Sequence, residues 1–168
     1  MAKIGLFYGT ASNSTQSIAK IIKDKLGDEV DTYDASLSSA RDIRKYDQLI
    51  LGTATWDEDG RLDDLNILLN QLQDKDLNGK TVALFGLGDQ RLYPEKFVNA
   101  LGTAYRTLLR KGAKVIGQWP TNGYDFSHST AKIGNHFVGL VLDEDNQGDL
   151  TEVRIDTWLN QVKNELIA

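Results

Sequence analysis

The chain contains no cysteine and only two histidines and two prolines. The absence of cysteine excludes disulfides, iron–sulfur clusters, thiolate zinc sites and a cysteine nucleophile. The two histidines, His128 and His136, leave little material for a histidine metal site, and we expect both to be surface or structural residues. The scarcity of proline argues against a linker-rich or disordered chain.

An excess of positive charge is also lacking. The chain has 19 lysine and arginine residues against 24 aspartate and glutamate residues, which gives a formal net charge of −5. Nucleic-acid binding needs a clear excess of basic side chains, so we expect no nucleic-acid partner. No stretch approaches the roughly 20 apolar residues that span a bilayer, and no signal peptide precedes the first apolar segment. We therefore expect a cytoplasmic protein that does not insert into a membrane.

The 168 residues, 40% hydrophobic and 26% charged, predict one globular domain spanning residues 1–168. Strands are expected at residues 3–8, 30–33, 48–52, 81–85, 114–117 and 136–142, and helices at 14–26, 62–72, 95–111 and 151–166, the last capped by Thr151. Strands separated by helices indicate a doubly wound α/β fold, in which helices cover both faces of a parallel sheet. We interpret the polar segment 118–135 as an insertion that interrupts the fifth strand.

In such a sheet, ligands bind beyond the carboxyl ends of the strands, so the loops after the first, third and fourth strands form the candidate site. The first loop carries four hydroxyl side chains within six residues, at Thr10, Ser12, Ser14 and Thr15, and leads into a helix. Free N–H groups at a helix N-terminus stabilise an anion. Hydroxyl donors without lysine or arginine favour a phosphate monoester held by neutral groups, although a hydroxyl can also simply cap the helix.

The other two loops each contribute an aromatic residue. Trp56 follows the third strand and Tyr93 follows the fourth, after Gly86 and Gly88. A tryptophan in a loop at a strand end favours ring stacking on a ligand, although tryptophan can also cover a sheet edge. The two glycines allow close approach of a ligand to the backbone. A flat aromatic ligand that carries one phosphate would satisfy all three loops.

These motifs resemble those of the flavodoxins, the small FMN-binding electron carriers, over nearly the whole chain. Residues 5–10, the Thr55-Trp56 pair and residues 86–90 followed by Tyr93 are similar to the family's opening strand and its FMN-stacking loops. Segments 123–126, 137–140 and 142–147 resemble the long-chain branch, which carries an insertion in strand five, and in particular the type that serves photosynthetic electron transfer. The resemblance implies a flavodoxin-like five-stranded sheet of order 2-1-3-4-5.

The resemblance further implies non-covalent FMN as the cofactor. The hydroxyls of the first loop and the N–H of Asn13 are expected to hold the phosphate, and Trp56 and Tyr93 to enclose the ring. Backbone groups of residues 57–60 and 88–90 are expected at the ring's polar edge, where a carbonyl at Gly60 or its neighbour turns to accept a hydrogen bond from the one-electron-reduced ring. The expected cofactor-binding residues are Thr10, Ala11, Ser12, Asn13, Ser14, Thr15, Thr55, Trp56, Asp57, Glu58, Asp59, Gly60, Leu87, Gly88, Asp89, Tyr93 and Phe97.

The chain departs from the family pattern at three places. Asn13 stands at the glycine of the family's phosphate loop, and asparagine tolerates a left-handed backbone better than most residues. Ala54 replaces a proline that often precedes the Thr-Trp pair. The acidic run 57–59 replaces a less charged stretch, and together with Asp89 it is expected to disfavour the anionic, fully reduced flavin through like-charge repulsion.

The resemblance therefore implies a low-potential one-electron carrier and not an enzyme with its own substrate turnover. We expect a monomer whose partners are redox proteins similar to ferredoxin–NADP reductase or a photosystem, with basic docking faces. An NAD(P)H-dependent quinone or flavin reductase of the same fold and a flavin-free binding module are the alternatives. A phosphorylated receiver domain is excluded because neutral residues, 8–10 and 52–53, stand where it needs acidic ones.

Charged side chains are expected to gather at opposite ends of the molecule. Acidic residues at 57–59, 63, 64 and 89 follow the strands at their carboxyl ends, whereas Arg106, Arg110, Lys111 and Lys114 lie toward the amino ends. The resulting dipole is expected to turn the cofactor toward a basic partner. We interpret the runs 143–145 and 110–111 as solvated surface.

Overall fold

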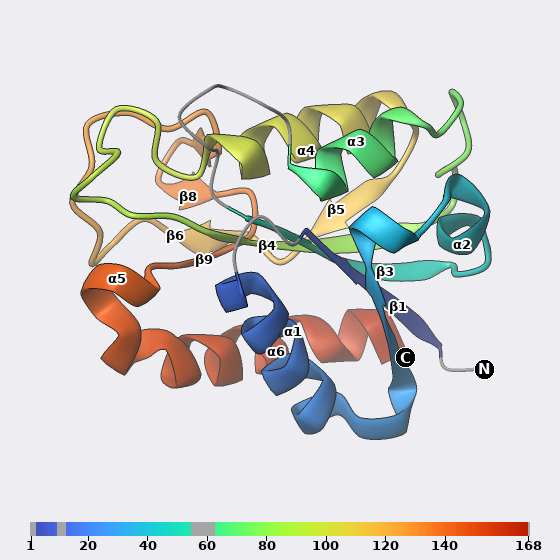
Figure 1. The fold of residues 1–168 in the computed structure, drawn as a ribbon, viewed down its shortest axis with the longest axis horizontal. Coiled ribbons are helices and arrows are strands. Elements are labelled where there is room, and N and C mark those ends of the chain that lie inside the picture. Colours follow the sequence, from blue (N-terminus) through green and yellow to red (C-terminus); the bar gives the residue numbers. More distant parts are fainter. Residues whose placement is uncertain (1–2, 10–12, 55–62, 168) are drawn as a thin grey trace.

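The computed structural model describes residues 3–9, 13–54 and 63–167. Its helices are α1 (Asn13–Leu26), α2 (Ala40–Arg44), α3 (Asp64–Asn70), α4 (Asn99–Arg110), α5 (Glu144–Gln147) and α6 (Thr151–Ile167). Its strands are β1 (Ile4–Tyr8), β2 (Val30–Asp34), β3 (Gln48–Thr53), β4 (Thr81–Leu87), β5 (Lys114–Ile116), β6 (Trp119–Pro120), β7 (Lys132–Ile133), β8 (His136–Phe137) and β9 (Leu140–Leu142). The main sheet is parallel with the order β2-β1-β3-β4-β5, and β9 also pairs with β4 (Figure 1). The predicted doubly wound α/β fold is confirmed.

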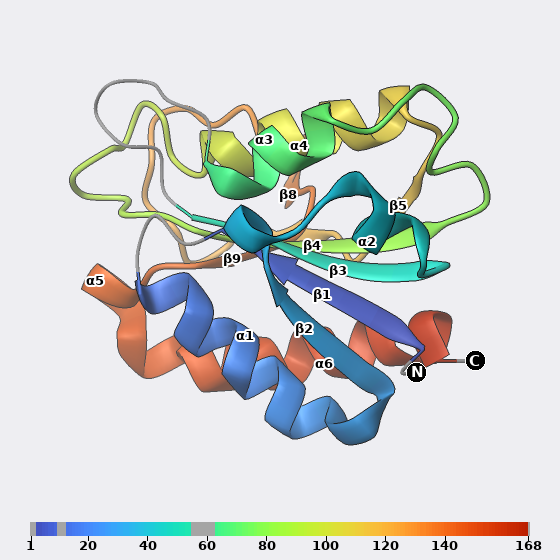
Figure 2. The same ribbon diagram turned by 45° about the vertical axis from the view of Figure 1, so that its right-hand side comes forward.

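Helices cover both faces of this sheet. α1 and α6 lie on one face, and α3 and α4 lie on the other (Figures 1 and 2). Successive strand residues therefore enter two separate cores: Leu6 packs on the side of α1 and α6, whereas Phe7 packs on the side of α3 and α4. Because neither face meets water, the inner strands are apolar between their end residues and do not alternate with polar residues; Gln48, Thr53 and Thr81 stand at strand ends.

The insertion interrupts strand five where the sequence predicts it. β5 pairs with residues 81–83 of β4, and β9 pairs with residues 85–87. The chain between them forms an antiparallel sheet of order β6-β8-β7. The expected continuous strand 136–142 is wrong, because it breaks at Val138 and Gly139 into β8 and β9. Gly139 passes directly over β4, where an added Cβ would lie 2.3 Å from the carbonyl oxygen of Leu84.

The start of α4 and the role of Thr151 in α6 differ most from the prediction, and α3 is shorter than expected, Asp64–Asn70. α4 begins at Asn99 and not at Glu95, because Val98 adopts a left-handed backbone with φ of 48°, which a right-handed helix cannot contain. Thr151 is the first residue of α6 and not the residue that precedes it. Its hydroxyl donates a hydrogen bond to the carboxylate of Glu144.

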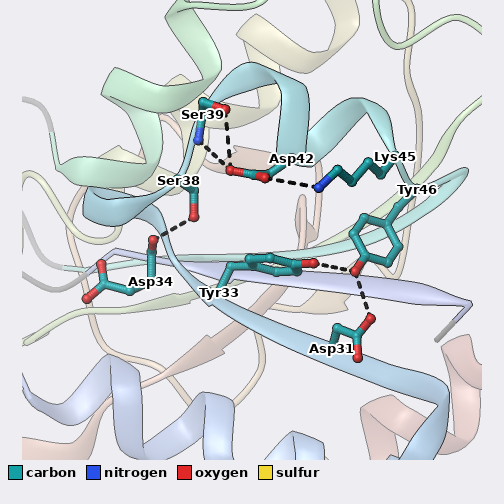
Figure 3. Close-up of polar contacts among 8 residues, drawn as sticks. All are labelled: Asp31, Tyr33, Asp34, Ser38, Ser39, Asp42, Lys45 and Tyr46. Atoms are coloured by element: carbon teal, nitrogen blue, oxygen red, sulfur yellow. Dashed lines mark hydrogen bonds and ion pairs between the residues drawn. The ribbon is translucent and has the colours of Figure 1, made fainter. Parts of the chain in front are cut away.

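An aromatic cluster holds β2 to the sheet (Figure 3). The ring of Tyr33 stacks on Phe7 with 4.5 Å between centroids. The hydroxyls of Tyr33 and Tyr46 are 2.5 Å apart, and Tyr46 donates to a carboxylate oxygen of Asp31 at 2.8 Å, so Tyr33 donates to Tyr46. Burial, reinforced by these hydrogen bonds, raises the pKa of Tyr46 above its ordinary value and keeps its proton in place. Polar β2 is thus fixed by aromatic packing as well as by its pairing with β1.

Candidate functional site

Three strand ends meet at one edge of the sheet. The chain passes from β1 to β2 on one side and returns to β3 on the other, so the strand order reverses between β1 and β3. Ligands of doubly wound sheets bind at this switch point. Tyr8 pairs with Gly52 and Thr53 pairs with Gly86, so the loops after β1, β3 and β4 begin side by side. The N–H of Gly9 extends this pairing by donating to the carbonyl of Gly52 at 3.0 Å.

The loop after β1 leads into the N-terminus of α1, a helix of 14 residues. Ser14 is half-buried, and Thr15 has no exposed surface. The hydroxyl oxygen of Thr15 is buried and has no hydrogen-bond partner among the described residues. An unsatisfied buried hydroxyl costs stability, so its presence points to a group that binds it from outside the described chain.

The start of α1 fits a phosphate group. The first turn contains no acidic residue, and the first charged residue of the helix is Lys20. The initial N–H groups of a helix have no partners within it and carry a partial positive charge. Together with the Thr15 hydroxyl they provide neutral donors for an anion, which is the arrangement that the sequence predicts.

The loop after β3 ends at Asp63, the N-cap of α3. One carboxylate oxygen of Asp63 accepts the N–H of Ala54 at 3.0 Å. The other accepts the backbone N–H and the side-chain amide of Asn66, at 3.0 and 2.9 Å. Gly9 lies against this carboxylate, because an added Cβ there would be 2.7 Å from an oxygen of Asp63. Asp63 therefore ties together the loops that follow β1 and β3.

This position corrects the expectation that Asp63 is a surface charge at the rim of the site. The side chain is only 5% exposed. Burial raises the pKa of Asp63 to about 6, although the hydrogen bonds from Asn66 and Ala54 act in the opposite direction. An aspartate three residues before an amide side chain at a helix start was the available sequence signal, and it was missed.

The loop after β4 is a compact turn built around Asp89. Its carboxylate accepts the N–H groups of Arg91 and Leu92 at 3.1 and 2.9 Å, and its carbonyl accepts the N–H of Tyr93 at 2.9 Å. Burial alone would favour the neutral acid, but hydrogen bonds from Leu92, Asn146 and Arg91 lower the pKa of Asp89. The loop therefore carries a negative charge at neutral pH, and the half-buried Tyr93 follows it.

Two expected cofactor-binding residues near this loop have side chains in the core. Phe97 has no exposed surface and packs against the rings of Tyr124, Phe126 and Phe137. Leu87 packs into the core on the side of α1 and α6. A side-chain contact between Phe97 and a ligand does not fit this position. The Phe97 ring instead packs against the loop at Gly88, where an added Cβ would lie 2.9 Å from a ring carbon.

The expectation that the acidic residues 143–145 are solvated surface is wrong for one of them. Glu144 and Asp145 are exposed as expected, but Asp143 has no exposed surface. Its carboxylate accepts hydrogen bonds from Gln90 in the loop after β4, which makes it a part of the site that sequence reasoning missed. Its place directly after the apolar strand β9 and three residues before Asn146 is typical of a helix cap.

The remaining predicted site residues, Thr10, Ala11, Ser12 and the run from Thr55 to Gly60, lie outside the described residues. They include Trp56, Asp57, Glu58 and Asp59, and the expected turning carbonyl. Asn13 is placed as the first residue of α1. The phosphate and ring contacts of these residues stay predictions.

The family model for flavodoxin matches residues 6–158 of the chain. A flavodoxin of the cyanobacterium Nostoc is 46% identical over 164 residues, covering 97% of this chain and 96% of that protein. The chain belongs to the flavodoxin family. Flavodoxin 1 of Escherichia coli is 43% identical over 99% of this chain and 96% of its own length, so this flavodoxin is almost equally similar to cyanobacterial and enterobacterial relatives.

A solved structure gives the same result for the fold. The crystal structure of Fusobacterium nucleatum flavodoxin bound to flavin mononucleotide matches with a TM-score of 0.87 and 32% identity, covering 99% of both chains. Flavodoxins transfer electrons to and from other redox proteins and do not turn over a substrate of their own.

Other kinds of site find no support in the described part of this flavodoxin. It contains no group of three or more histidine, cysteine, aspartate or glutamate side chains that could hold a metal ion. His128 and His136 are both exposed, as the sequence analysis expects. Within the described ranges, no helix is long and apolar enough to cross a membrane.

We predict that Thr15→Ala weakens the binding of FMN to the apoprotein by about 10- to 100-fold, because a hydrogen bond to a charged group contributes roughly 1.5–3 kcal/mol. Riboflavin, which lacks the phosphate, should lose much less affinity. Flavin fluorescence titration measures both constants. Thr15→Ser keeps the hydroxyl and should bind FMN nearly as the parent does; equal losses for FMN and riboflavin would show that Thr15 does not contact the phosphate.

We predict that the free energy of unfolding of Asp63→Asn rises relative to that of the parent as pH increases from 4 to 7. The folded-state pKa of Asp63 is raised, so the stability linked to its neutral form is complete at about pH 4 and is lost as pH rises through about 6. Relative to the parent, the variant should gain roughly 2–3 kcal/mol over this range, measured by urea unfolding of the apoproteins.

An asparagine oxygen can still accept the N–H of Asn66 and cap the helix, while its amide then faces the N–H of Ala54. This cost does not change with pH, so the pH dependence reports the buried carboxylate. Asp74→Asn, at an exposed position away from the three loops, is the matched control for the loss of a carboxylate. A stability difference between Asp63→Asn and the parent that stays constant with pH would contradict the prediction.

Proposed function

We propose that this flavodoxin carries single electrons on non-covalently bound FMN at the three loops described above. The observation that carries the proposal is the buried hydroxyl of Thr15, which lacks a partner at the start of a long helix. The FMN-bound relative from Fusobacterium nucleatum has the same fold over 99% of both chains and supports the choice of ligand. FMN supplies the redox chemistry, because its ring accepts and releases single electrons.

The protein's own residues bind and orient the cofactor in this proposal. Thr15, Ser14 and the first N–H groups of α1 hold the phosphate, together with Thr10 and Ser12. Tyr93 and Trp56 enclose the ring. These contacts require no cation, which distinguishes the site from the phosphate sites that use lysine or arginine.

The charges near the ring set the proposed direction of electron flow. Asp89 is ionised at neutral pH, since hydrogen bonds outweigh the effect of its partial burial and lower its pKa. Adding negative charge to a ring beside a fixed carboxylate is unfavourable. We infer that the second one-electron reduction has a low potential, as a strongly reducing donor requires.

We further propose that the partners present basic docking faces, as a reductase of the ferredoxin–NADP type or a photosystem subunit could. Glu144, Asp145 and Asp125 are exposed close to the loop after β4. The basic residues Arg106, Arg110 and Lys114 are exposed at the end of α4 and the start of β5, at the amino ends of the strands. This distribution gives a dipole with its negative end at the cofactor, which raises the encounter rate with a basic partner.

The carrier function predicts that the FMN-loaded protein oxidises NADPH only when a reductase is present. The alternative, an NAD(P)H-dependent flavin or quinone reductase, predicts steady oxidation by the loaded protein alone. Absorbance at the NADPH band, with and without a ferredoxin–NADP reductase and with cytochrome c as the final acceptor, separates the two. An apoprotein that gains no yellow flavin spectrum with FMN would instead favour the flavin-free binding module.

The proposed docking predicts that the rate of electron transfer from a basic reductase falls with ionic strength. Screening shortens the range of the dipole, since the Debye length is about 10 Å at 0.1 M salt and about 3 Å at 1 M. Stopped-flow measurements across a salt series test this. A maximum at low salt, where over-tight complexes misorient, is compatible with the proposal; a flat or steadily rising profile contradicts it.

A further inference from the structure

A carboxylate with no exposed surface lies behind the loop after β4. Asp143 is the N-cap of α5, and its two oxygens accept hydrogen bonds from four N–H groups, two from Gln90 and two from Asn146. It forms no ion pair with a described lysine or arginine. A buried charge is stable only when its hydrogen-bonding capacity is filled, so the positions of these donors are tightly coupled to the carboxylate.

Gln90 connects this carboxylate to the insertion. Its backbone N–H and its side-chain amide donate to one oxygen of Asp143 at 3.0 and 2.7 Å. Its amide oxygen accepts the backbone N–H of Asp125 at 2.6 Å. Gln90 is only 5% exposed and uses both ends of its side chain in these bonds. One loop residue is therefore fixed from two directions, by the cap of α5 and by the insertion.

Asn146 connects the same carboxylate to the next part of the loop. Its side-chain amide donates to both oxygens of Asp143 and also to a carboxylate oxygen of Asp89, at 2.8 Å. That oxygen of Asp89 also accepts the N–H groups of Arg91 and Leu92, which form the turn. The geometry of the turn that leads to Tyr93 thus depends on a hydrogen-bonded chain that ends at Asp143.

On the side of the insertion, side-chain packing around the loop is incomplete. A cavity of about 400 Å³ lies between the loop and the insertion, and its walls include Gln90, Pro94, Phe126 and Gln147. Around this cavity the loop is held by polar contacts, which include those of Gln90 and the N–H groups of Ser127 and His128 on the carbonyl of Pro94.

We propose that Asp143 and Gln90 are positioning residues for the cofactor: they hold the loop from Gly88 to Tyr93 in the shape that receives the flavin ring. The inference rests on the proposed function and concerns two side chains outside the expected binding set. The backbone N–H of Gln90, expected at the ring's polar edge, donates instead to Asp143. The inference also gives the insertion a role, since Asp125 supplies the second anchor of Gln90. Neither side chain needs to touch the cofactor for this role.

The acceptor at position 143 must be a carboxylate. All four groups that face it are donors, and an asparagine there would place its own amide N–H against one of them. Asp143→Asn is therefore a severe test that leaves the side-chain shape unchanged. Gln90→Met removes the side-chain bonds to Asp143 and Asp125 with a similar volume and leaves the buried charge in place.

We expect Asp143→Asn and Gln90→Met each to weaken FMN and riboflavin by the same factor, about tenfold, because the loop faces the ring, which both ligands share. Asp145→Asn removes the same charge from an exposed position on the same helix and should bind both ligands within about twofold of the parent. Fluorescence titration of the folded apoproteins measures these constants. Equal affinities for all three variants and the parent would overturn the inference.

A redox titration separates positioning from a purely structural role. At saturating FMN, a loosened loop admits water to the ring, which stabilises the fully reduced anion and raises the potential of the second one-electron step. We expect the largest rise for Asp143→Asn, which also removes a buried negative charge, a smaller rise for Gln90→Met and none for Asp145→Asn. Lower thermal stability with unchanged affinities and potentials would assign Asp143 to folding alone and would overturn the inference.

FMN binding by the parent protein distinguishes a failure of this inference from a failure of the proposed function. If the parent apoprotein binds no FMN, the proposed function itself fails. If the parent binds FMN and only the variants at positions 143 and 90 lose affinity and change potential, both proposals stand. Hydrogen exchange at the amides of residues 88–93 in the FMN-bound proteins should be faster in these two variants than in Asp145→Asn.

Discussion

A parallel sheet covered on both faces leaves its strand ends as the place where polar groups can act. Side chains along the inner strands meet a helix layer on either face, so β1, β3 and β4 are apolar between their first and last residues. At that edge the backbone leaves the ladder, and its N–H groups need new acceptors. Two buried carboxylates provide them: Asp63 for the loop after β3 and Asp143 for the loop after β4. The shape of the site follows from how these acceptors are satisfied.

The sequence predicts the sheet and its helix layers well, because burial of a strand on both faces requires a continuous run of apolar residues. Continuous apolar runs separated by helical periodicity identify β1, β3 and β4, and a polar interval identifies the insertion. The pattern fails where a single backbone conformation decides the outcome. The left-handed Val98 delays the start of α4, and the close approach of Gly139 to β4 breaks the strand after β8. Neither event changes hydrophobic periodicity, so neither could be read from it.

The candidate site is predictable only where its chemistry depends on residues that are neighbours in the sequence. A cluster of hydroxyls at a helix start can be recognised from the local sequence, and in the structure the Thr15 hydroxyl is buried there without a partner among the described residues. The buried positions of Asp63 and Asp143 cannot be recognised in this way. A carboxylate within a polar stretch is normally expected on the surface, and only the fold brings its N–H partners to it. The donors to these two carboxylates come from Ala54, nine residues away, and from Gln90, 53 residues away. Such pairings are properties of the assembled sheet edge and leave no local signal beyond that of a helix cap.

The absence of cations links these features to the proposed redox role. Among the described residues of the three loops, the cations are Arg91 and Lys96, and both side chains are exposed. The proposed phosphate site offers neutral donors, Asp63 and Asp143 are held by neutral N–H groups, and Asp89 is kept ionised by its hydrogen bonds. A ring bound as proposed would therefore face carboxylates and peptide dipoles, with no buried positive charge among the described loop residues to stabilise an added electron. In a medium of low dielectric constant this imbalance is weakly screened, and it favours the release of the electron to a partner.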